Sequence, residues 1–280
     1  MTFNPEAISP ANGYLNISPA ARDMLAREQK RVTPIKITFW VLAILALAAA
    51  FRQSEIDFVQ LVKNLGNTGQ YLRGYFPPNW VDWKIYLRDT LVTIAMGVWG
   101  TLFAAAIAVP LSLLASDNIC PVWIVQPVRR LLDAMRAINE IVFALMFVVA
   151  VGLGPFAGVL ALAIHTAGSL GKLYSEAVEA IDPGPVEGIR ATGASAFQEV
   201  VFGVLPQVMP LWTSFTLYRF EANVRSASVL GIVGAGGIGV SLYQSFGAFQ
   251  YGKVCTILII LIAATSAIDF LSAQLRRRLI

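Results

Sequence analysis

Two long runs without a charged residue constrain this chain more than any other feature: Thr90–Ser116 and Ile141–Gly171. A helix crosses the apolar core of a bilayer with about 20 predominantly apolar residues. The whole chain is 56% hydrophobic and only 14% charged, whereas a soluble domain carries roughly 25% charged residues. The sequence therefore predicts an all-α, polytopic membrane protein and excludes an ordinary soluble domain.

The uncharged runs divide into six predicted membrane spans. The run from Ile141 is too long for one helix, and Gly152–Pro155 (GLGP) predicts a tight turn within it, because glycine and proline interrupt helices. We expect an N-terminal segment, 1–36, in which Ser18-Pro19 begins a helix, and a transmembrane domain, 37–280. The predicted spans are about 37–51, 90–115, 138–153, 156–172, 210–230 and 254–271.

The positions of lysine and arginine predict the orientation, because cytoplasmic loops of membrane proteins carry an excess of these residues. An even number of spans places both termini on one side. That side carries thirteen basic residues, against six on the other (Arg52, Lys63, Arg73, Lys84, Arg88 and Lys253). We therefore expect both termini in the cytoplasm. Membrane topology, not nucleic-acid binding, explains the net charge of +4.

The predicted outer segment between the first two spans contains a further helix signal. Ser54 can cap a helix with Asp57 three residues later, and an apolar stripe runs from Phe58 to Leu65. Prolines and tryptophans of Phe76–Trp83 suit the membrane interface. This segment is either an in-plane anchoring helix or a landing site for an external partner.

The predicted cytoplasmic stretch 182–206 is polar, ordered and punctuated by glycine. Asp182-Pro183 predicts the start of a short helix, and Gly193 predicts its end in the left-handed conformation. A second helix then begins with Ser195 and Gln198 in the positions of a capping box, followed by an apolar stripe from Phe197 to Leu205. The residues alone allow two interpretations: an interfacial helix that only packs against the bundle, or a docking surface.

The spacing of Glu187, Gly193 and Leu205-Pro206 resembles the EAA loop of ABC-importer permeases. In that family the loop is the coupling helix, which inserts into a groove on the cytoplasmic ATPase subunit. The resemblance implies that Glu187, Gly193, Ala194 and Ser195 couple this chain to an ATPase. Gly188 and Gly203 depart from the family pattern, and Gly188 should weaken the first short helix.

Three longer segments resemble the permease subunit of phosphonate importers: PVRRLLDAMRAINEIVFALMFVVAVGLGPFAGVLAL, SEAVEAIDPGPVEGIRATGA and YRFEANVRSASVLGIVGAGGIGVSL. The resemblance covers the chain from the first span to the C-terminus. It implies an ABC-importer permease fold in the bacterial inner membrane, acting as a homodimer with two ATPase subunits and a periplasmic phosphonate-binding protein. ATP and Mg²⁺ would be bound by the ATPase subunits, and no cofactor is expected in this chain. Phosphonate, phosphite and hypophosphite remain open as substrates.

Three charged residues lie within the fifth predicted span: Arg219, Glu221 and Arg225. An arginine at the centre of a bilayer costs about 2.5–3.5 kcal/mol on insertion scales, so these side chains should face protein or water. Glu221 and Arg225 could form an i, i+4 ion pair, or the span could end early and leave them at the interface. The third interpretation is an anion pathway, with Ser226 and Ser228 beside it, because arginine matches oxyanion geometry.

Gly234–Gly239 (GAGGIG) has the spacing of a dinucleotide-binding motif, but that motif requires a βαβ unit, which this chain is not expected to contain. The glycines suit close helix contact or a hinge, and the family resemblance places Gly234, Gly236 and Gly237 beside the translocation pathway. No phosphate-binding loop of the G-x-x-x-x-G-K-[ST] type occurs, so we do not expect this chain to hydrolyse ATP.

The remaining polar residues carry weaker signals. His165 is expected to be a packed, hydrogen-bonded side chain rather than a proton relay. Glu140 suits the N-terminus of a helix, with a gating role as the alternative. Cys120 and Cys255 lie far apart in the sequence and predict neither a disulfide nor a metal site.

Three rival functions remain open at this stage. One is an ABC-importer permease for another small solute, such as a methionine-like one. An ion-coupled secondary transporter would carry intramembrane acidic residues and internal repeats, which are not evident. A membrane enzyme acting on phosphorylated lipids would need a catalytic constellation, which the sequence does not show.

Overall fold

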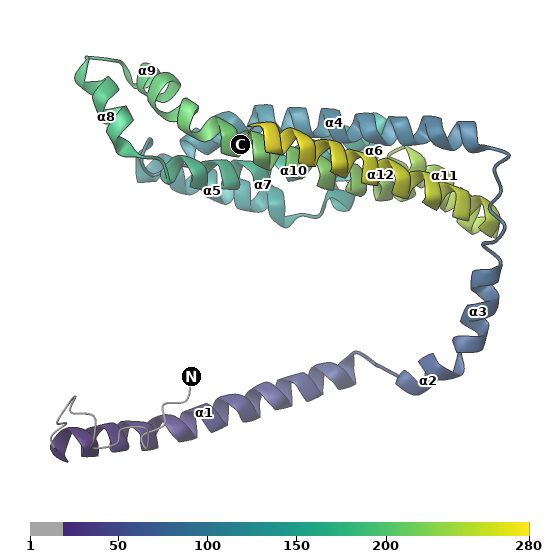
Figure 1. Cartoon of the computed structure of the whole chain (residues 1–280), viewed down its shortest axis with the longest axis horizontal. Coiled ribbons are helices and arrows are strands. Elements are labelled where there is room, and N and C mark those ends of the chain that lie inside the picture. The colour runs from purple at the N-terminus through teal and green to yellow at the C-terminus, as the bar shows by residue number, and fades with distance from the viewer. Residues whose placement is uncertain (1–18, 280) are drawn as a thin grey trace. The chain divides into compact units, whose positions relative to one another are not determined.

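The described chain is built from helices (Figure 1). The computed structural model describes the backbone of residues 19–279 and the side chains of residues 36–277 other than Leu61 and Gln70. The chain divides into two units, 1–68 and 69–280, and each is described by itself. Most of the predicted N-terminal segment 1–36, including the cap expected at Ser18, lies outside the described side chains.

The first unit contains one long helix, α1 (Pro19–Gln53), whose Lys36–Gln53 part is long and apolar enough to cross a membrane. Its large apolar side chains are exposed throughout that part, including Phe39 (65%), Trp40 (64%) and Leu47 (70%). A helix that is apolar on all sides is suited to lipid, which agrees with the first predicted span.

The predicted outer helix begins three residues later than expected. Asp57, not Ser54, is the N-cap of α2 (Phe58–Lys63), and its carboxylate accepts a hydrogen bond from the Gln60 N–H at 2.9 Å. The Ser54 hydroxyl instead donates to the Ala50 carbonyl at 2.7 Å, at the end of α1. The predicted stripe is also divided, because α2 ends at Asn64 and α3 (Leu65–Arg73) follows it.

The second unit carries the remaining helices, in this order: α4 (Trp83–Leu114), α5 (Val122–Ala137), α6 (Glu140–Val151), α7 (Pro155–Glu179), α8 (Pro183–Ala191), α9 (Ala196–Gln198), the π-helix η2 (Glu199–Val204), α10 (Leu205–Leu230), the 3-10 turn η3 (Gly231–Val233), α11 (Ile238–Gly247) and α12 (Tyr251–Leu279). The helices α4, α7, α10 and α12 run along one bundle, with α8 and α9 beyond one end and α11 at the other (Figure 1).

The described residues contain five helices long and apolar enough to cross a membrane, or six if one bent pair counts as a span. That pair is α5 and α6, which meet at 87°, and it corrects the third predicted span. α6 has only 12 residues, about 18 Å at 1.5 Å per residue, so it cannot cross alone. The GLGP turn lies between α6 and α7 as predicted, with positive φ at Gly152 and Gly154.

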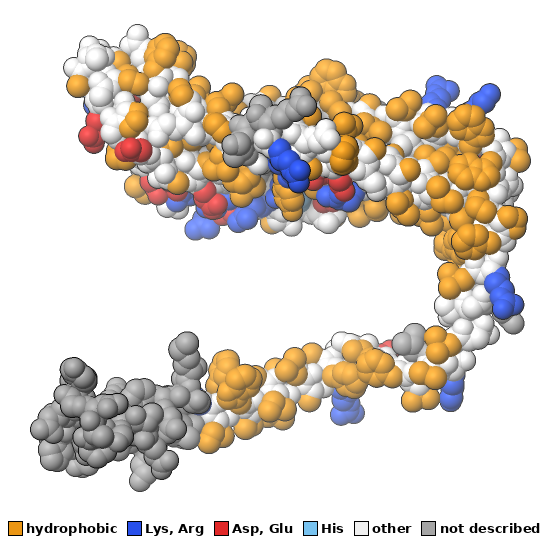
Figure 2. Space-filling view, in the orientation of Figure 1, with side chains coloured by type: hydrophobic (Ala, Val, Ile, Leu, Met, Phe, Trp, Pro, Cys, Tyr) orange, Lys and Arg blue, Asp and Glu red, His pale blue; other side chains and the backbone are white. Residues whose placement is uncertain are grey.

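Apolar side chains cover much of the visible face of the bundle, and acidic and basic side chains gather beside α5 and α8 (Figure 2). Exposed apolar side chains on the spans include Trp99 (54%), Leu102 (51%) and Ile262 (62%). Such a surface is costly in water and favourable in the hydrocarbon core of a bilayer.

Small residues let the central helices approach closely. At Gly100 on α4, a Cβ atom would lie 2.8 Å from the Leu162 Cβ of α7. At Gly168 on α7, it would lie 2.8 Å from both the Leu132 carbonyl oxygen and the Arg136 amide nitrogen of α5. Since lipid tails are as apolar as leucine, such close packing replaces the hydrophobic effect in holding membrane helices together.

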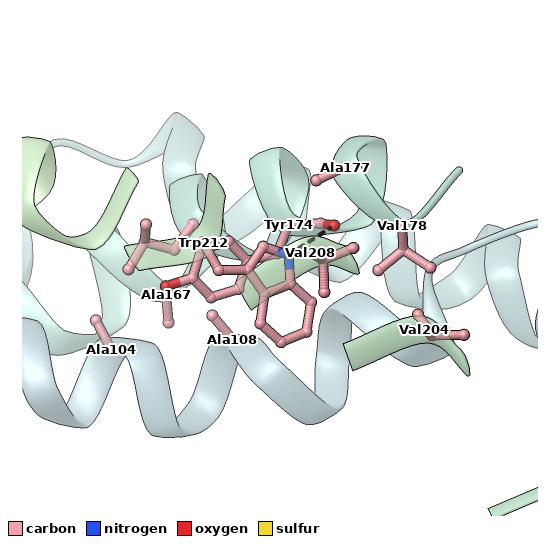
Figure 3. Packing of buried hydrophobic residues seen from close by; sticks show 10 residues of the cluster. Ala104, Ala108, Ala167, Tyr174, Ala177, Val178, Val204, Val208 and Trp212 are labelled. Atoms are coloured by element: carbon pink, nitrogen blue, oxygen red, sulfur yellow. Dashed lines mark hydrogen bonds between the residues drawn. The ribbon is translucent and has the colours of Figure 1, made fainter. Parts of the chain in front are cut away.

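Buried polar contacts fix the register of the same helices. Asn223 on α10 accepts a hydrogen bond from the Thr166 hydroxyl of α7 and donates one to the Thr101 hydroxyl of α4, both at 2.8 Å. Nearer to α8, the rings of Tyr174 and Trp212 stack with centroids 4.6 Å apart, and Ala104 and Ala108 of α4 lie beside them (Figure 3). Three spans are therefore joined by specific contacts.

Gly168→Ala should lower the thermal midpoint of the detergent-solubilised protein by several degrees. The added methyl group meets backbone atoms of α5 on contact, and overpacking of this kind typically costs about 1–3 kcal/mol. Gly188→Ala is the matched control, because nothing lies within 4 Å of a Cβ atom there and alanine favours a helix by about 1 kcal/mol over glycine. Equal midpoints for the two variants would contradict the packing account.

Candidate functional site

The corner from Asp182 to Gln198 folds as the sequence predicts. The Asp182 carboxylate caps α8 by accepting a hydrogen bond from the Gly184 N–H at 2.9 Å. Gly193 has a φ of 82°, in the left-handed region that glycine adopts without steric cost. Ser195 and Gln198 form the capping box of α9, with the Ser195 N–H donating to Gln198 Oε1 at 2.8 Å.

Two contacts that the sequence analysis did not single out hold α8 against the following helix. Arg190 donates from Nε and Nη2 to the two carboxylate oxygens of Glu199, at 3.0 and 2.8 Å. Gly203 is buried, and a Cβ atom there would lie 3.2 Å from the Val186 Cα. The departure from the family pattern at Gly203 therefore has a packing reason, since it leaves room for α8.

The apolar stripe predicted from Phe197 to Leu205 is wrong in part. Glu199–Val204 form a π-helix, whose i→i+5 hydrogen bonds widen each turn, so residues three and four apart do not keep one face. Val204 is 3% exposed, but Phe197 is 77% and Phe202 65% exposed. The segment Phe197–Leu205 therefore buries only its C-terminal part and presents the rings of Phe197 and Phe202 outward.

The other predicted corner residues lie at or near its surface. Glu187 and Ser195 are exposed and Ala194 is half-buried. Glu187 and Arg190 line a cavity of about 610 Å³ between the corner and the loop after α4. Beside this cavity, Arg129 forms ion pairs with Asp117, at 2.9 Å, and with Glu179, which lines the cavity.

The corner continues into the bundle without a break. Ala196–Val233 form one span candidate of 38 residues. The fifth span was predicted from residue 210, but α10 already begins at Leu205, with Pro206 in its first turn and Pro210 inside it. The charged residues of α10 therefore lie on a helical path that begins directly after the predicted corner residues Gly193, Ala194 and Ser195.

The structure overturns both structural alternatives for the charges of α10. Glu221 and Arg225 do not pair with each other. Arg276 of α12 donates to Glu221 at 2.7 Å, and Arg225 donates to Asp269 of α12 at 2.9 Å. The span does not end early, since α10 continues to Leu230. The sequence separation of 44 and 55 residues hid these partners.

Arg219 differs from these charges. Within the described residues it makes no hydrogen bond or ion pair, and its Nε is buried without a partner. It lines a cavity of about 540 Å³ together with Asp133, Arg136, Ala137, His165 and Ser169. The pathway candidate from the sequence thus faces a polar cavity between α5, α7 and α10.

Ser226 and His165 meet at Glu140, the first residue of α6. The Ser226 hydroxyl donates to Glu140 Oε1 at 2.8 Å, and His165 Nε2 lies 3.6 Å from Glu140 Oε2. The other ring nitrogen, His165 Nδ1, lies 2.9 Å from the Ile138 carbonyl oxygen, so it carries the proton, because a carbonyl only accepts. The prediction of a hydrogen-bonded His165 is confirmed. The Ser228 hydroxyl donates to the Arg225 carbonyl at 2.7 Å.

The glycine-rich segment after α10 makes close contacts with two other elements. Gly234, Gly236 and Gly237 all have positive φ, between 72° and 87°. The Gly154 N–H donates to the Gly234 carbonyl at 3.0 Å, so the segment packs on the GLGP turn. A Cβ atom at Gly237 would lie 2.5 Å from Thr93 Oγ1. No strand occurs within residues 19–279, so the motif lacks the βαβ context of a dinucleotide site.

Comparison with known proteins identifies relatives over most of the chain. The family model described as "Binding-protein-dependent transport system inner membrane component" matches residues 108–280. The "Putative phosphite transport system permease protein HtxC" of Stutzerimonas stutzeri is 40% identical over 90% of this chain and 91% of its own length. The "Putative cryptic phosphonate transport system permease protein PhnE2" of Escherichia coli K12 is 60% identical over 43% of this chain and 99% of its own length.

A solved structure supports the fold. One chain of the inward-facing MetNI methionine ABC transporter superposes with a TM-score of 0.62 at 22% identity. The match covers 69% of this chain and 95% of that chain. At this identity it shows a shared fold alone.

Gly193→Val should speed amide hydrogen exchange in residues 183–204, because a β-branched residue is strained at positive φ by about 1–3 kcal/mol. Gly193→Asn is the matched control, since asparagine adopts the left-handed conformation more readily. The space around Gly193 is open, so only backbone strain separates the two variants. Equal exchange in both would show that the left-handed corner does not hold α8 in place.

Proposed function

Because the chain belongs to the family of binding-protein-dependent transport system inner membrane components, we propose that it is the permease subunit of an ATP-driven importer of phosphonate-class oxyanions. The names of its relatives, which refer to phosphite and phosphonate transport, support this substrate class. Phosphonate, phosphite and hypophosphite are all small anions whose oxygens accept hydrogen bonds from arginine in the same way. The chain itself supplies the route through the bacterial inner membrane.

The proposed assembly contains two copies of this chain, two cytoplasmic ATPase subunits that bind ATP and Mg²⁺, and a periplasmic binding protein that delivers the ligand. Both termini and the corner from Asp182 to Gln198 lie in the cytoplasm. This orientation agrees with the excess of basic residues on that side.

Glu187, Gly193, Ala194 and Ser195 form the contact with the ATPase subunit. The observation that carries this proposal is the unbroken helical path Ala196–Val233. Because the Arg190–Glu199 pair ties α8 to the start of that path, a force applied at the corner moves α10 as a rigid element. ATP-driven closure of the ATPase subunits then reaches α10 through this helical path.

The translocation pathway runs beside α10 and the glycine segment that follows it. Its proposed residues are Arg219, Glu221, Arg225, Ser226, Ser228, Gly234, Gly236 and Gly237. The Glu221–Arg276 and Arg225–Asp269 pairs join α10 to α12, so movement of α10 changes contacts at the pathway itself. Alternating access follows: the pathway opens outward to a loaded binding protein when ATP is bound and inward after hydrolysis.

The first test is ATP hydrolysis by the complex of this chain with its ATPase subunit, reconstituted in lipid. The binding protein loaded with methylphosphonate or phosphite should stimulate hydrolysis above the rate with the empty binding protein. Stimulation by a loaded protein carrying a different solute, with none by either oxyanion, would keep the importer and overturn the substrate class. Uptake that persists without ATP would overturn the importer in favour of an ion-coupled transporter.

The coupling contact is tested by the two Gly193 variants in the same complex. Gly193→Val should lower stimulated hydrolysis and uptake at least about five-fold, the lower end of a coupling loss of 1–3 kcal/mol. Gly193→Asn should retain most of both activities. Normal uptake by Gly193→Val would contradict the coupling role of the corner.

A further inference from the structure

Arg219 is the one charged residue of α10 that has no partner among the described residues. The other charged residues of α10 have carboxylate or guanidinium partners on α12, namely Asp269 for Arg225 and Arg276 for Glu221. Arg219 has no such partner within the described residues, and its Nε is buried. A guanidinium is always charged, and a buried N–H without an acceptor is rare in folded proteins. The position is therefore built for an acceptor that the chain does not provide.

The cavity beside Arg219 gathers the groups that an oxyanion requires. Arg136 projects from the end of α5, and His165 and Ser169 lie four residues apart on one face of α7. Ser169 is 8% exposed, and its hydroxyl makes no hydrogen bond within the described part of the chain. Two guanidinium groups, one hydroxyl, one imidazole and the Asp133 carboxylate thus line an open pocket of about 540 Å³.

We propose that this cavity is an oxyanion-binding site within the permease, with Arg219 and Arg136 as its two charged ligands and Ser169 as a neutral donor. The proposal deepens the proposed function and rests on it, because the chemical class of the ligand is the same. Arginine fits this ligand because its planar fork donates two parallel hydrogen bonds to a phosphorus oxyanion. The site lies between α5, α7 and α10, and the last of these continues from the corner that begins at Ala196.

In the unliganded site, Asp133 is hydrogen-bonded to one of the two arginines, Arg136. Arg136 donates to its Oδ1 from Nε at 3.0 Å and from Nη2 at 2.7 Å. This carboxylate uses the same fork that an oxyanion would use. The ligand therefore competes with Asp133 for Arg136, whereas Arg219 is free to bind first. Because the ligand must displace the Asp133 carboxylate from Arg136, its net binding free energy is reduced, and the site can release it.

Two backbone contacts set the position of Arg136. Gly168 lets the turn Leu132–Arg136 of α5 lie directly on α7. His165 Nδ1 donates a hydrogen bond to the carbonyl of Ile138, which lies two residues beyond Arg136. His165 is therefore a positioning residue, which acts through the α5–α6 bend rather than by contact with the ligand.

The test measures binding without the binding protein. The full permease–ATPase complex is placed in lipid nanodiscs, and phosphite is titrated while its ³¹P line width is recorded. Arg219→Gln and Arg136→Gln should each weaken binding about ten-fold, the loss expected when one hydrogen bond from a charged group is removed. Arg88→Gln, at an exposed arginine of α4, removes the same charge outside the cavity and should bind as the unaltered chain does.

Asp133→Asn separates ligand binding from a merely structural role. It removes the competing carboxylate and frees Arg136, so phosphite should bind several-fold more tightly. Loss of stability alone would weaken binding in every variant and could not produce this gain. Because the ATPase subunits bind phosphate groups as well, only differences among these variants count.

The outcomes divide clearly between the two proposals. Weaker binding by both arginine variants together with tighter binding by Asp133→Asn supports the site. Unchanged line widths for Arg219→Gln, in a complex whose ATPase is still stimulated by the loaded binding protein, would overturn the site and leave the importer intact. An unaltered complex that does not broaden the phosphite line would overturn the site, and one whose hydrolysis is stimulated by no loaded binding protein would overturn the importer function itself.

Discussion

Close approach between helix backbones is the constraint on which the rest of this structure depends. In a bilayer, lipid provides no hydrophobic force to bring helices together, so contact at small residues must do so. Gly100 brings α4 against α7, and Gly168 brings α5 against α7. The second contact decides where Arg136 lies, and therefore which groups share its cavity. A single methyl group at Gly168 would move a charged residue as well as a helix.

The polar and charged side chains of α10 fall into three arrangements, and the differences between them separate structural from functional roles. Asn223 satisfies its side chain between two threonines and joins three spans. Glu221 and Arg225 form ion pairs with Arg276 and Asp269 of α12, which neutralise their charges and link the two helices. Arg219 alone among these groups lacks an acceptor in the described chain. The first two arrangements are complete without a ligand, and the third is not.

The route from the cytoplasmic corner to that site is a helix with one irregular section. The π-helix Glu199–Val204 lies where the corner joins α10, and wide turns of this kind occur most often at functional sites. Phe202 of this π-helix is exposed and Val204 is buried, and Phe197 of the preceding α9 is exposed as well. A partner that binds the exposed rings would therefore act on the helical path that continues into α10, the helix that carries Arg219.

The sequence by itself determined the class of the protein, most of its spans and the local geometry of the corner. Long uncharged runs have one stable environment, and the left-handed glycine at Gly193 and the Ser195 capping box depend only on neighbouring residues. The α5–α6 bend, by contrast, was missed, because α5 carries four charged residues and the uncharged run begins only after the bend, at Ile141. The π-helix was missed for a related reason, since its apolar residues fit a 3.6-residue period equally well.

Tertiary structure alone decided the ion partners. Arg225 and Glu221 pair with residues 44 and 55 positions away, and an i, i+4 spacing pointed to the wrong partner. Arg136 and Arg219 carry no sequence signal that joins them, because only the crossing of α5, α7 and α10 brings them to one cavity. Hydrogen bonds and charges act over a few ångströms in space, and the distance between two helices in space is not encoded in their spacing along the chain.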